Sequence, residues 1–131
     1  MCNHPFKPFF DFENVSFRYY KNSEEAVLEN IDLKIPAGAT VGIIGSTGSG
    51  KTSLVNLIPR FYDSLSGTVK VGGIDVKEYK LENLRNGVSM VLQNGSLFSG
   101  TIADNLRWGD KNATPEQMKE ACYIACADEF I

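Results

Sequence analysis

The sequence predicts an α/β fold, and three stretches carry this prediction. Residues 11–36 read as two strands, because apolar side chains recur mostly at every second position. The apolar run over residues 40–44 predicts a buried strand, which turns through a glycine-rich segment into a helix over residues 53–58. From Thr101 onward the apolar pattern becomes helical.

Turn and capping residues divide the rest of the chain. Gly72-Gly73 predicts a hairpin, and a short helix near residues 81–85 and a strand over residues 88–92 are expected after it. One helix is expected over residues 101–108. Thr114-Pro115-Glu116-Gln117 opens another, with an N-cap, a proline at the first helical position and a capping box. The periodicity of that helix places five residues on one face: Met118, Ala121, Cys122, Ala125 and Cys126.

Composition excludes several classes of protein. The chain has 131 residues, of which 43% are hydrophobic and 22% charged, and this is typical of an ordinary globular domain. A net charge of -3 offers no basic field, so we expect no nucleic-acid partner. No apolar run is long enough to span a membrane, and the first residues lack a signal-peptide pattern, so a cytosolic chain is expected. Cys2, Cys122 and Cys126 form no CxxC pair, which favours reduced, packed thiols over a disulfide or a metal site.

The glycine-rich segment carries the strongest functional signal. Residues 45–52 read Gly-Ser-Thr-Gly-Ser-Gly-Lys-Thr, the pattern of a phosphate-binding loop between a strand and a helix. Glycines let main-chain N–H groups point inward at an anion, and the following helix adds the positive end of its dipole. Lys51 would reach the β- and γ-phosphates, and the Thr52 hydroxyl would bind magnesium. The alternative, a Gly/Ser turn with an accidental lysine, is disfavoured by the flanking strand and helix.

The presence of this loop makes two other side chains candidates for nucleotide binding. Gln93 follows the expected strand over residues 88–92, and its amide oxygen suits magnesium or an attacking water. Tyr19 ends the first expected strand, where a flat ring could stack on an adenine base. Without the loop, Gln93 would be a solvated strand end and Tyr19 a core or edge aromatic.

At the level of motifs, the chain resembles the nucleotide-binding domain of ATP-binding cassette (ABC) transporters of the exporter type. The resemblance covers residues 11–131. It is carried by several motifs in the order of the family: residues 12–19, 27–33, 45–52, 66–69, 73–76 and 97–106. Lys51-Thr52-Ser53 stands where the family usually has Lys-Ser-Thr, a swap that preserves the hydroxyl groups.

This resemblance implies an architecture. The fold is expected to be a P-loop NTPase-type sheet with an antiparallel β subdomain and the start of a helical subdomain, that is, an incomplete α/β domain. Residues 1–10 would be a linker, residues 11–100 the nucleotide-binding core, and residues 101–131 a truncated start of the helical subdomain. The family would continue to a signature loop, a catalytic Glu and a switch His, and His4 cannot be that histidine. We therefore expect either a partial reading frame or a deliberately shortened piece of a longer protein.

The resemblance also implies ligands and contact residues. ATP and Mg²⁺ are the expected cofactors, with Thr52 and Gln93 as magnesium ligands and Gln93 as the γ-phosphate sensor. The transmembrane domain would be met near residues 94–102, and a second nucleotide-binding domain would complete the site. The residues expected to contact nucleotide are Tyr19, Val27, Ser46, Thr47, Gly48, Ser49, Gly50, Lys51, Thr52, Ser53 and Gln93.

Function is expected at two levels. The parent protein would be an ATP hydrolase that drives export, at the cytoplasmic face of a membrane. The isolated chain would hold nucleotide without turnover, because the catalytic Glu, signature loop and switch His are absent from its 131 residues. Binding without turnover is also the alternative for the parent. A kinase-type phosphotransferase and a cassette protein acting on DNA or the ribosome are disfavoured, the first for want of an acceptor pocket and the second by the exporter-like motif and the acidic charge.

Overall fold

A computed structural model describes residues 9–20, 23 and 25–130 and divides them into two compact units. The first unit extends to Met90 and the second is Val91–Ile131, and each is described by itself. The boundaries expected at residues 10 and 100 stay predictions. Cys2 and His4 lie outside the described residues.

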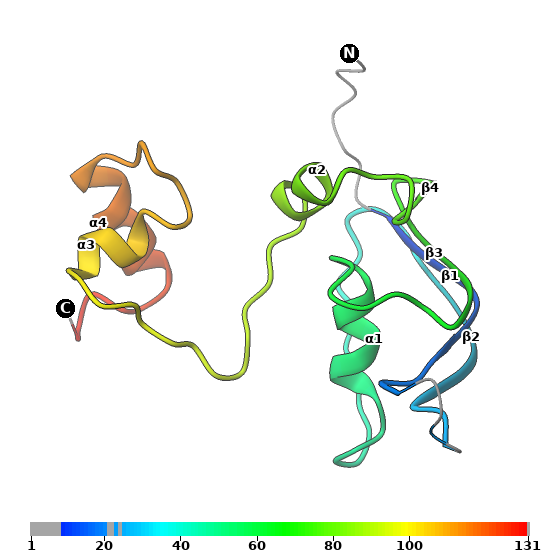
Figure 1. Ribbon diagram of the computed structural model, residues 1–131. Coiled ribbons are helices and arrows are strands. Elements are labelled where there is room, and N and C mark those ends of the chain that lie inside the picture. Colours follow the sequence, from blue (N-terminus) through cyan, green and yellow to red (C-terminus); the bar gives the residue numbers. More distant parts are fainter. Residues whose placement is uncertain (1–8, 21–22, 24, 131) are drawn as a thin grey trace. The chain divides into compact units, whose positions relative to one another are not determined.

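A four-stranded antiparallel sheet forms the basis of the first unit (Figure 1). Its strands are β1 (Phe10–Phe17), β2 (Leu28–Ile35), β3 (Ser66–Val71) and β4 (Ile74–Asp75), in the spatial order β2-β1-β3-β4. The alternation of residues 11–36 therefore predicted β1 and β2 correctly. The Gly72-Gly73 hairpin is also confirmed, because Val71 pairs with Ile74 across it.

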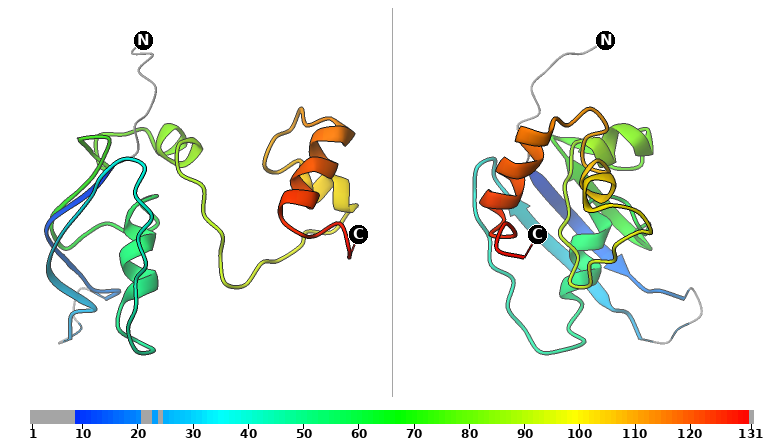
Figure 2. Two further views of the ribbon diagram at one scale, coloured as in Figure 1. Left: turned by 180° about the vertical axis from the view of Figure 1, so that it is seen from behind. Right: turned by 90° about the vertical axis from the view of Figure 1, so that its left-hand side faces the viewer.

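Helix α1 (Lys51–Leu57) covers one face of this sheet, as both views of Figure 2 show. Leu54 and Leu57 of α1 are buried in one cluster with Phe12 and Phe17 of β1 and Val69 of β3. Each fully buried side chain of this kind contributes about 1.5–3 kcal/mol to the free energy of unfolding. Helix α2 (Leu81–Asn86), which confirms the short helix expected there, adds the fully buried Leu84 to the same core.

Two expected strands are not formed. Residues 40–44 and 88–92 are assigned no strand, and within the described residues neither segment pairs with a neighbour. A strand needs a partner for its backbone N–H and C=O groups, and an apolar run alone does not provide one. The side chains of residues 40–44 are exposed, Ile44 to 96%. Gln93 consequently does not follow a strand, contrary to expectation.

The second unit contains helices α3 (Ile102–Leu106) and α4 (Pro115–Ile124), which contact each other. The expected start of α4 is confirmed in detail: the Thr114 side chain accepts a hydrogen bond from the Gln117 N–H, and Gln117 Oε1 accepts one from the Thr114 N–H. Helix α3 is shorter than expected, because it ends at Leu106 rather than Trp108. None of the helices in the described part of the chain has the length and apolarity needed to cross a membrane.

The one-face prediction for α4 is only partly correct. Met118 and Cys122 are buried, but Ala121 is exposed. Cys126 lies beyond the helix end with a positive φ of 52° and is also exposed. The exposure of Cys126 contradicts the expected packing of the thiol pair, whereas Cys122 is buried as expected.

A bulge in β1 leaves no room for a side chain at one glycine of β3. The β1–β3 register shifts between Glu13 and Ser16, and Asn14 adopts a φ of 51° inside the shift. Gly67 lies at this point with a φ of +76°, and a Cβ there would overlap the backbone carbonyl of Asn14. Gly38 has a similar φ of +78° but open space around its Cα.

These two glycines form a matched pair for a stability measurement. Gly38→Ala should lower the free energy of unfolding by about 1–2 kcal/mol, the cost of a left-handed alanine. Gly67→Ala should cost that amount plus about 1–3 kcal/mol more, because the β1–β3 ladder must shift to relieve the overlap. Urea denaturation followed by circular dichroism measures both values. Equal losses at the two positions would contradict the close approach.

Candidate functional site

The loop over residues 45–52 encloses the ammonium group of Lys51. Nζ of Lys51 donates hydrogen bonds to the carbonyl oxygens of Gly45 at 2.9 Å and Ser46 at 2.7 Å, and to Oγ of Ser49 at 3.3 Å. The side chain therefore lies back across the loop that precedes it. A cation held there by neutral acceptors is available to an anion that enters the loop.

Glycines make this loop conformation possible. Gly48 and Gly50 have φ values of +85° and +83°, and Gly50 is the N-cap of α1. A Cβ on Gly50 would meet the Val27 carbonyl oxygen and Leu28 Cδ2, both at 2.8 Å. Gly50 thus lets the start of α1 approach the beginning of β2, and this brings Val27 beside the loop.

Two adjoining hollows lie next to the loop. The smaller has a volume of about 300 Å³ and is lined by Tyr19, Val27, Gly48, Ser49, Gly50, Lys51, Thr52 and Ser53. The larger has a volume of about 410 Å³ and is lined by Tyr19, Tyr20, Ser23, Glu25, Ala26, Val27, Gly48 and Ser49. The structure therefore brings together most of the site residues predicted from sequence. Ser46 and Thr47 lie in the same loop, whereas Gln93 belongs to the second unit.

Tyr19 lines both hollows, as do Val27, Gly48 and Ser49. It lies two residues beyond β1, its hydroxyl is 2.8 Å from Oγ of the buried Ser53, and it is 48% exposed. Tyr20, its neighbour in sequence, lines only the larger hollow and is 78% exposed. Ser23 and Glu25 also line that hollow and were not expected from the sequence, because they lie in a polar turn without periodicity.

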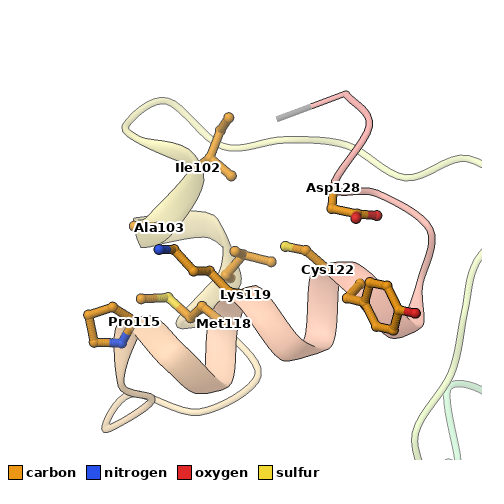
Figure 3. Close-up of a pocket in the computed structure, with 9 residues that line it drawn as sticks. Ile102, Ala103, Pro115, Met118, Lys119, Cys122 and Asp128 are labelled. Carbon is orange, nitrogen blue, oxygen red and sulfur yellow. The ribbon is translucent and has the colours of Figure 1, made fainter.

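A third hollow, larger than the other two, lies within the second unit between α3 and α4 (Figure 3). It measures about 580 Å³ and is lined mainly by apolar side chains, including Ile102, Met118 and Cys122. Its charged lining residues are Lys119 and Asp128, of opposite sign. It lacks a glycine-rich loop, so its size alone does not make it a site for phosphate.

The second unit also holds an ordered, exposed loop. The N–H of Phe98 donates to Oδ1 of Asn105 at 2.7 Å, and Nδ2 of Asn105 donates to the carbonyl oxygens of Phe98 at 3.0 Å and Thr101 at 2.9 Å. The rings of Phe98 and Trp108 are 5.1 Å apart, and both are mostly exposed, as is Leu97. This side of the loop therefore presents apolar groups on a fixed backbone.

Comparison with known proteins assigns the family. The ABC transporter family profile matches residues 28–129. The chain belongs to the ABC transporter family. Among solved structures, a bacterial Atm1-family ABC exporter with ATP bound is similar, with a TM-score of 0.87 and 31% identity over 94% of this chain and 22% of that one. The α/β class and the resemblance to the exporter type are thus confirmed.

Curated ABC transporter proteins are also similar over most of this chain. An uncharacterized ABC transporter ATP-binding protein, YknV of Bacillus subtilis (strain 168), is 46% identical over 92% of this chain and 20% of its own length. The ATP-dependent lipid A-core flippase of Desulfotalea psychrophila (strain LSv54 / DSM 12343) is 41% identical over 97% of this chain and 22% of its own length. The chain therefore spans about a fifth of the length of these relatives.

The start of α3 provides a pH-sensitive contact. The Thr101 side chain and its backbone N–H both donate to Oδ2 of Asp104, at 2.6 and 3.1 Å. These two bonds, with a smaller contribution from the charge of Arg107, lower the pKa of Asp104. A carboxylate whose pKa is lowered by folding stabilises the fold fully above its unfolded value, and this stabilisation is lost as pH falls through the lowered pKa.

We expect Thr101→Val to return the pKa of Asp104 toward the ordinary aspartate value of about 3.9, because it removes the hydroxyl donor. Thr101→Ser should keep the lowered value, and Arg107→Gln should raise it less than Thr101→Val does. Carbon-detected NMR titration of the Asp104 carboxyl group measures each pKa. A pKa unchanged in Thr101→Val would show that the hydroxyl contact is not formed.

Proposed function

We propose that this chain is the part of an ABC exporter that binds ATP together with Mg²⁺. The observation that carries the proposal is the position of the Lys51 ammonium, held by carbonyls of its own glycine-rich loop at the edge of a hollow. An incoming phosphate would replace these neutral acceptors with charged ones, and an ammonium group binds a charged oxygen more strongly than a neutral carbonyl. The proposed nucleotide contacts are the residues that line the smaller hollow, together with Ser46, Thr47 and Gln93. The lining residues are Tyr19, Val27, Gly48, Ser49, Gly50, Lys51, Thr52 and Ser53.

The residues at the hollow fit a magnesium ion brought in with the nucleotide. Mg²⁺ usually keeps several waters and binds one or two protein oxygens plus substrate phosphates. The exposed side chain of Thr52 lines the hollow beside Lys51 and supplies a hydroxyl oxygen. We propose the amide oxygen of Gln93 as the other ligand and as the sensor of the γ-phosphate. Bound Mg²⁺ would neutralise charge on the phosphates.

The base is proposed to lie on Tyr19, beside Val27. Tyr19 combines a half-exposed ring with a position shared by both hollows, whereas Tyr20 lines one of them. A ring in this position offers a face to any purine, so the proposed contact contributes affinity without selecting adenine by hydrogen bonds.

Partners are proposed from the second unit and from the family. Residues 94–102 would contact the transmembrane domain, supported by the exposed Leu97 and Phe98 on a loop that Asn105 holds. A second nucleotide-binding domain would complete the ATP site, and no nucleic acid is involved. The chain would then lie on the cytoplasmic side of a membrane, where ATP bound to the whole protein drives export of a substrate.

Binding without turnover is proposed for the isolated chain, while the whole protein hydrolyses ATP. Phosphoryl transfer requires a group that orients or activates the attacking water. Within the described part of the chain, no Asp or Glu lines the hollow around Lys51 and Thr52. Glu25 lines the neighbouring hollow, on the side where Tyr20 lies.

Substituting Lys51 tests the proposed ATP site. Lys51→Ala should weaken ATP binding by roughly 2–4 kcal/mol, or about 30- to 700-fold, because a charge-assisted contact is lost. Lys111→Ala, which removes an exposed lysine of the second unit, should leave the affinity unchanged. Equilibrium titration with a fluorescent ATP analogue measures both. Equal affinities of the Lys51 variant and the unaltered chain would refute ATP binding at this loop.

Phosphate release tests the absence of turnover. The unaltered chain with Mg²⁺ and ATP should release phosphate no faster than Lys51→Ala, because none of the described residues that line the hollow is a carboxylate able to orient or activate water. A coupled assay of inorganic phosphate at saturating ATP makes the comparison. Steady hydrolysis that Lys51→Ala abolishes would instead show that the isolated chain contains a catalytic base.

A further inference from the structure

Three aromatic rings meet at the edge of the candidate ATP site. The ring of Tyr19 is edge-on to Phe17, with centroids 4.9 Å apart, and edge-on to Tyr62 at 5.2 Å. Phe17 and Tyr62 are themselves 5.5 Å apart, so each ring contacts the other two. Phe17 is only 2% exposed and anchors the cluster in the core, while Tyr62 is 43% exposed. Edge-to-face pairs at such distances are attractive beyond their buried area.

Tyr19 needs such contacts because its backbone is not held in the sheet. It follows the last residue of β1, Phe17, by two positions. Its hydroxyl is hydrogen-bonded to Ser53 of α1, which fixes one end of the side chain. The ring can still turn about the axis through that hydroxyl, and the edge contact of Tyr62 opposes this rotation.

The turn that carries Tyr62 is itself firmly held. Arg85 of α2 donates from Nε to the carbonyl oxygen of Pro59 at 3.2 Å and from Nη2 to that of Arg60 at 3.0 Å. Nε of Arg60 donates to Oδ1 of Asp63 at 2.6 Å. Arg60 has a φ of 54°, a conformation that arginine rarely adopts and that persists only when surrounding contacts impose it.

Tyr62 does not itself reach the proposed nucleotide position. Among the described residues that line the two hollows beside the loop, Tyr19 is present and Tyr62 is not. A specific effect of Tyr62 on binding of the base would therefore act through the ring of Tyr19, which it contacts. This separates a positioning role from a direct contact.

We propose that Tyr62, on the turn held by Arg85, is a positioning residue that keeps the Tyr19 ring oriented for stacking on the base of the nucleotide. The inference rests on the proposed ATP-binding function and adds to it a residue outside the glycine-rich loop. A ring oriented before binding loses less conformational freedom when the base arrives, so affinity for nucleotide is higher. Affinity for the phosphate chain alone does not depend on Tyr62.

Calorimetric titration with Mg-ATP and with Mg-tripolyphosphate, which lacks a base, tests the proposal. Tyr62→Leu should weaken ATP binding roughly 2- to 10-fold, the range expected for an aromatic pair, and leave tripolyphosphate binding unchanged. Tyr62→Phe keeps the ring and should retain the affinity for ATP. In a Tyr19→Ala background, Tyr62→Leu should have no further effect.

The possible results separate this inference from the function on which it rests. If Tyr19→Ala weakens ATP binding and Tyr62→Leu does not, the positioning role is wrong and the stacking proposal stands. Equal weakening of ATP and tripolyphosphate by Tyr62→Leu would mean a structural role and would also overturn the inference. Loss of both ligands in Lys51→Ala supports the loop assignment independently of Tyr62, whereas an unaltered chain that binds neither ligand overturns both proposals.

A measurement without substitutions guards against variants that fail to fold. With the unaltered chain free of nucleotide, NMR should show through-space cross-peaks between ring protons of Tyr19 and Tyr62, because the ring centroids are 5.2 Å apart. Absence of these cross-peaks, with Tyr19–Phe17 cross-peaks present, would overturn the positioning role.

Discussion

The packing of α1 onto the antiparallel sheet is the constraint on which the candidate site depends. Leu54 and Leu57 fix the helix against β1 and β3, and the start of the helix is therefore fixed as well. That start is the C-terminal end of the glycine-rich loop, so burial of two leucines determines where Lys51 lies. The close approach of Gly50 to Val27 then sets the distance from the loop to β2. Core packing therefore determines loop geometry, since a shift of α1 would move the ammonium group and the adjoining hollow together.

The sheet itself explains why the strands expected over residues 40–44 and 88–92 are absent. β1 pairs on both sides, with β2 and β3, and its core-facing side chains are covered by α1. Residues 40–44 have comparable apolar character but no described partner, so their side chains remain exposed. Propensity for a strand is therefore realised only where hydrogen-bonding neighbours exist. Exposed apolar residues at an unpaired segment are also a surface for self-association.

Features encoded by local chemistry could be predicted from the sequence. Gly72-Gly73 specifies its hairpin and Thr114 with Gln117 specifies a capping box, because the interacting groups are within a few residues of each other. The glycine-rich loop is equally local, and its pattern led to Lys51 directly. The contact of Tyr19 with Tyr62 could not be predicted in this way, since it joins the end of β1 to a turn beyond α1. The bulge at Asn14 and its close contact with Gly67 are non-local for the same reason.

The strained backbone of Arg60 indicates that the turn beside Tyr19 is held in place by its surrounding contacts. Asn14 and Asn30 also have positive φ, but asparagine tolerates the left-handed region through its short polar side chain. Arg60 lacks that advantage, and its conformation costs about 1–2 kcal/mol. Its carbonyl accepts a hydrogen bond from Arg85, and its guanidinium donates to Asp63, so contacts on both sides hold the turn in this conformation. On the same turn, the Phe61 ring packs against Arg85, whose guanidinium carbon lies 5.4 Å from the ring centroid. The next residue, Tyr62, contacts Tyr19 instead. Residues outside the glycine-rich loop, on the turn after α1 and on α2, therefore determine the orientation of the ring at its edge.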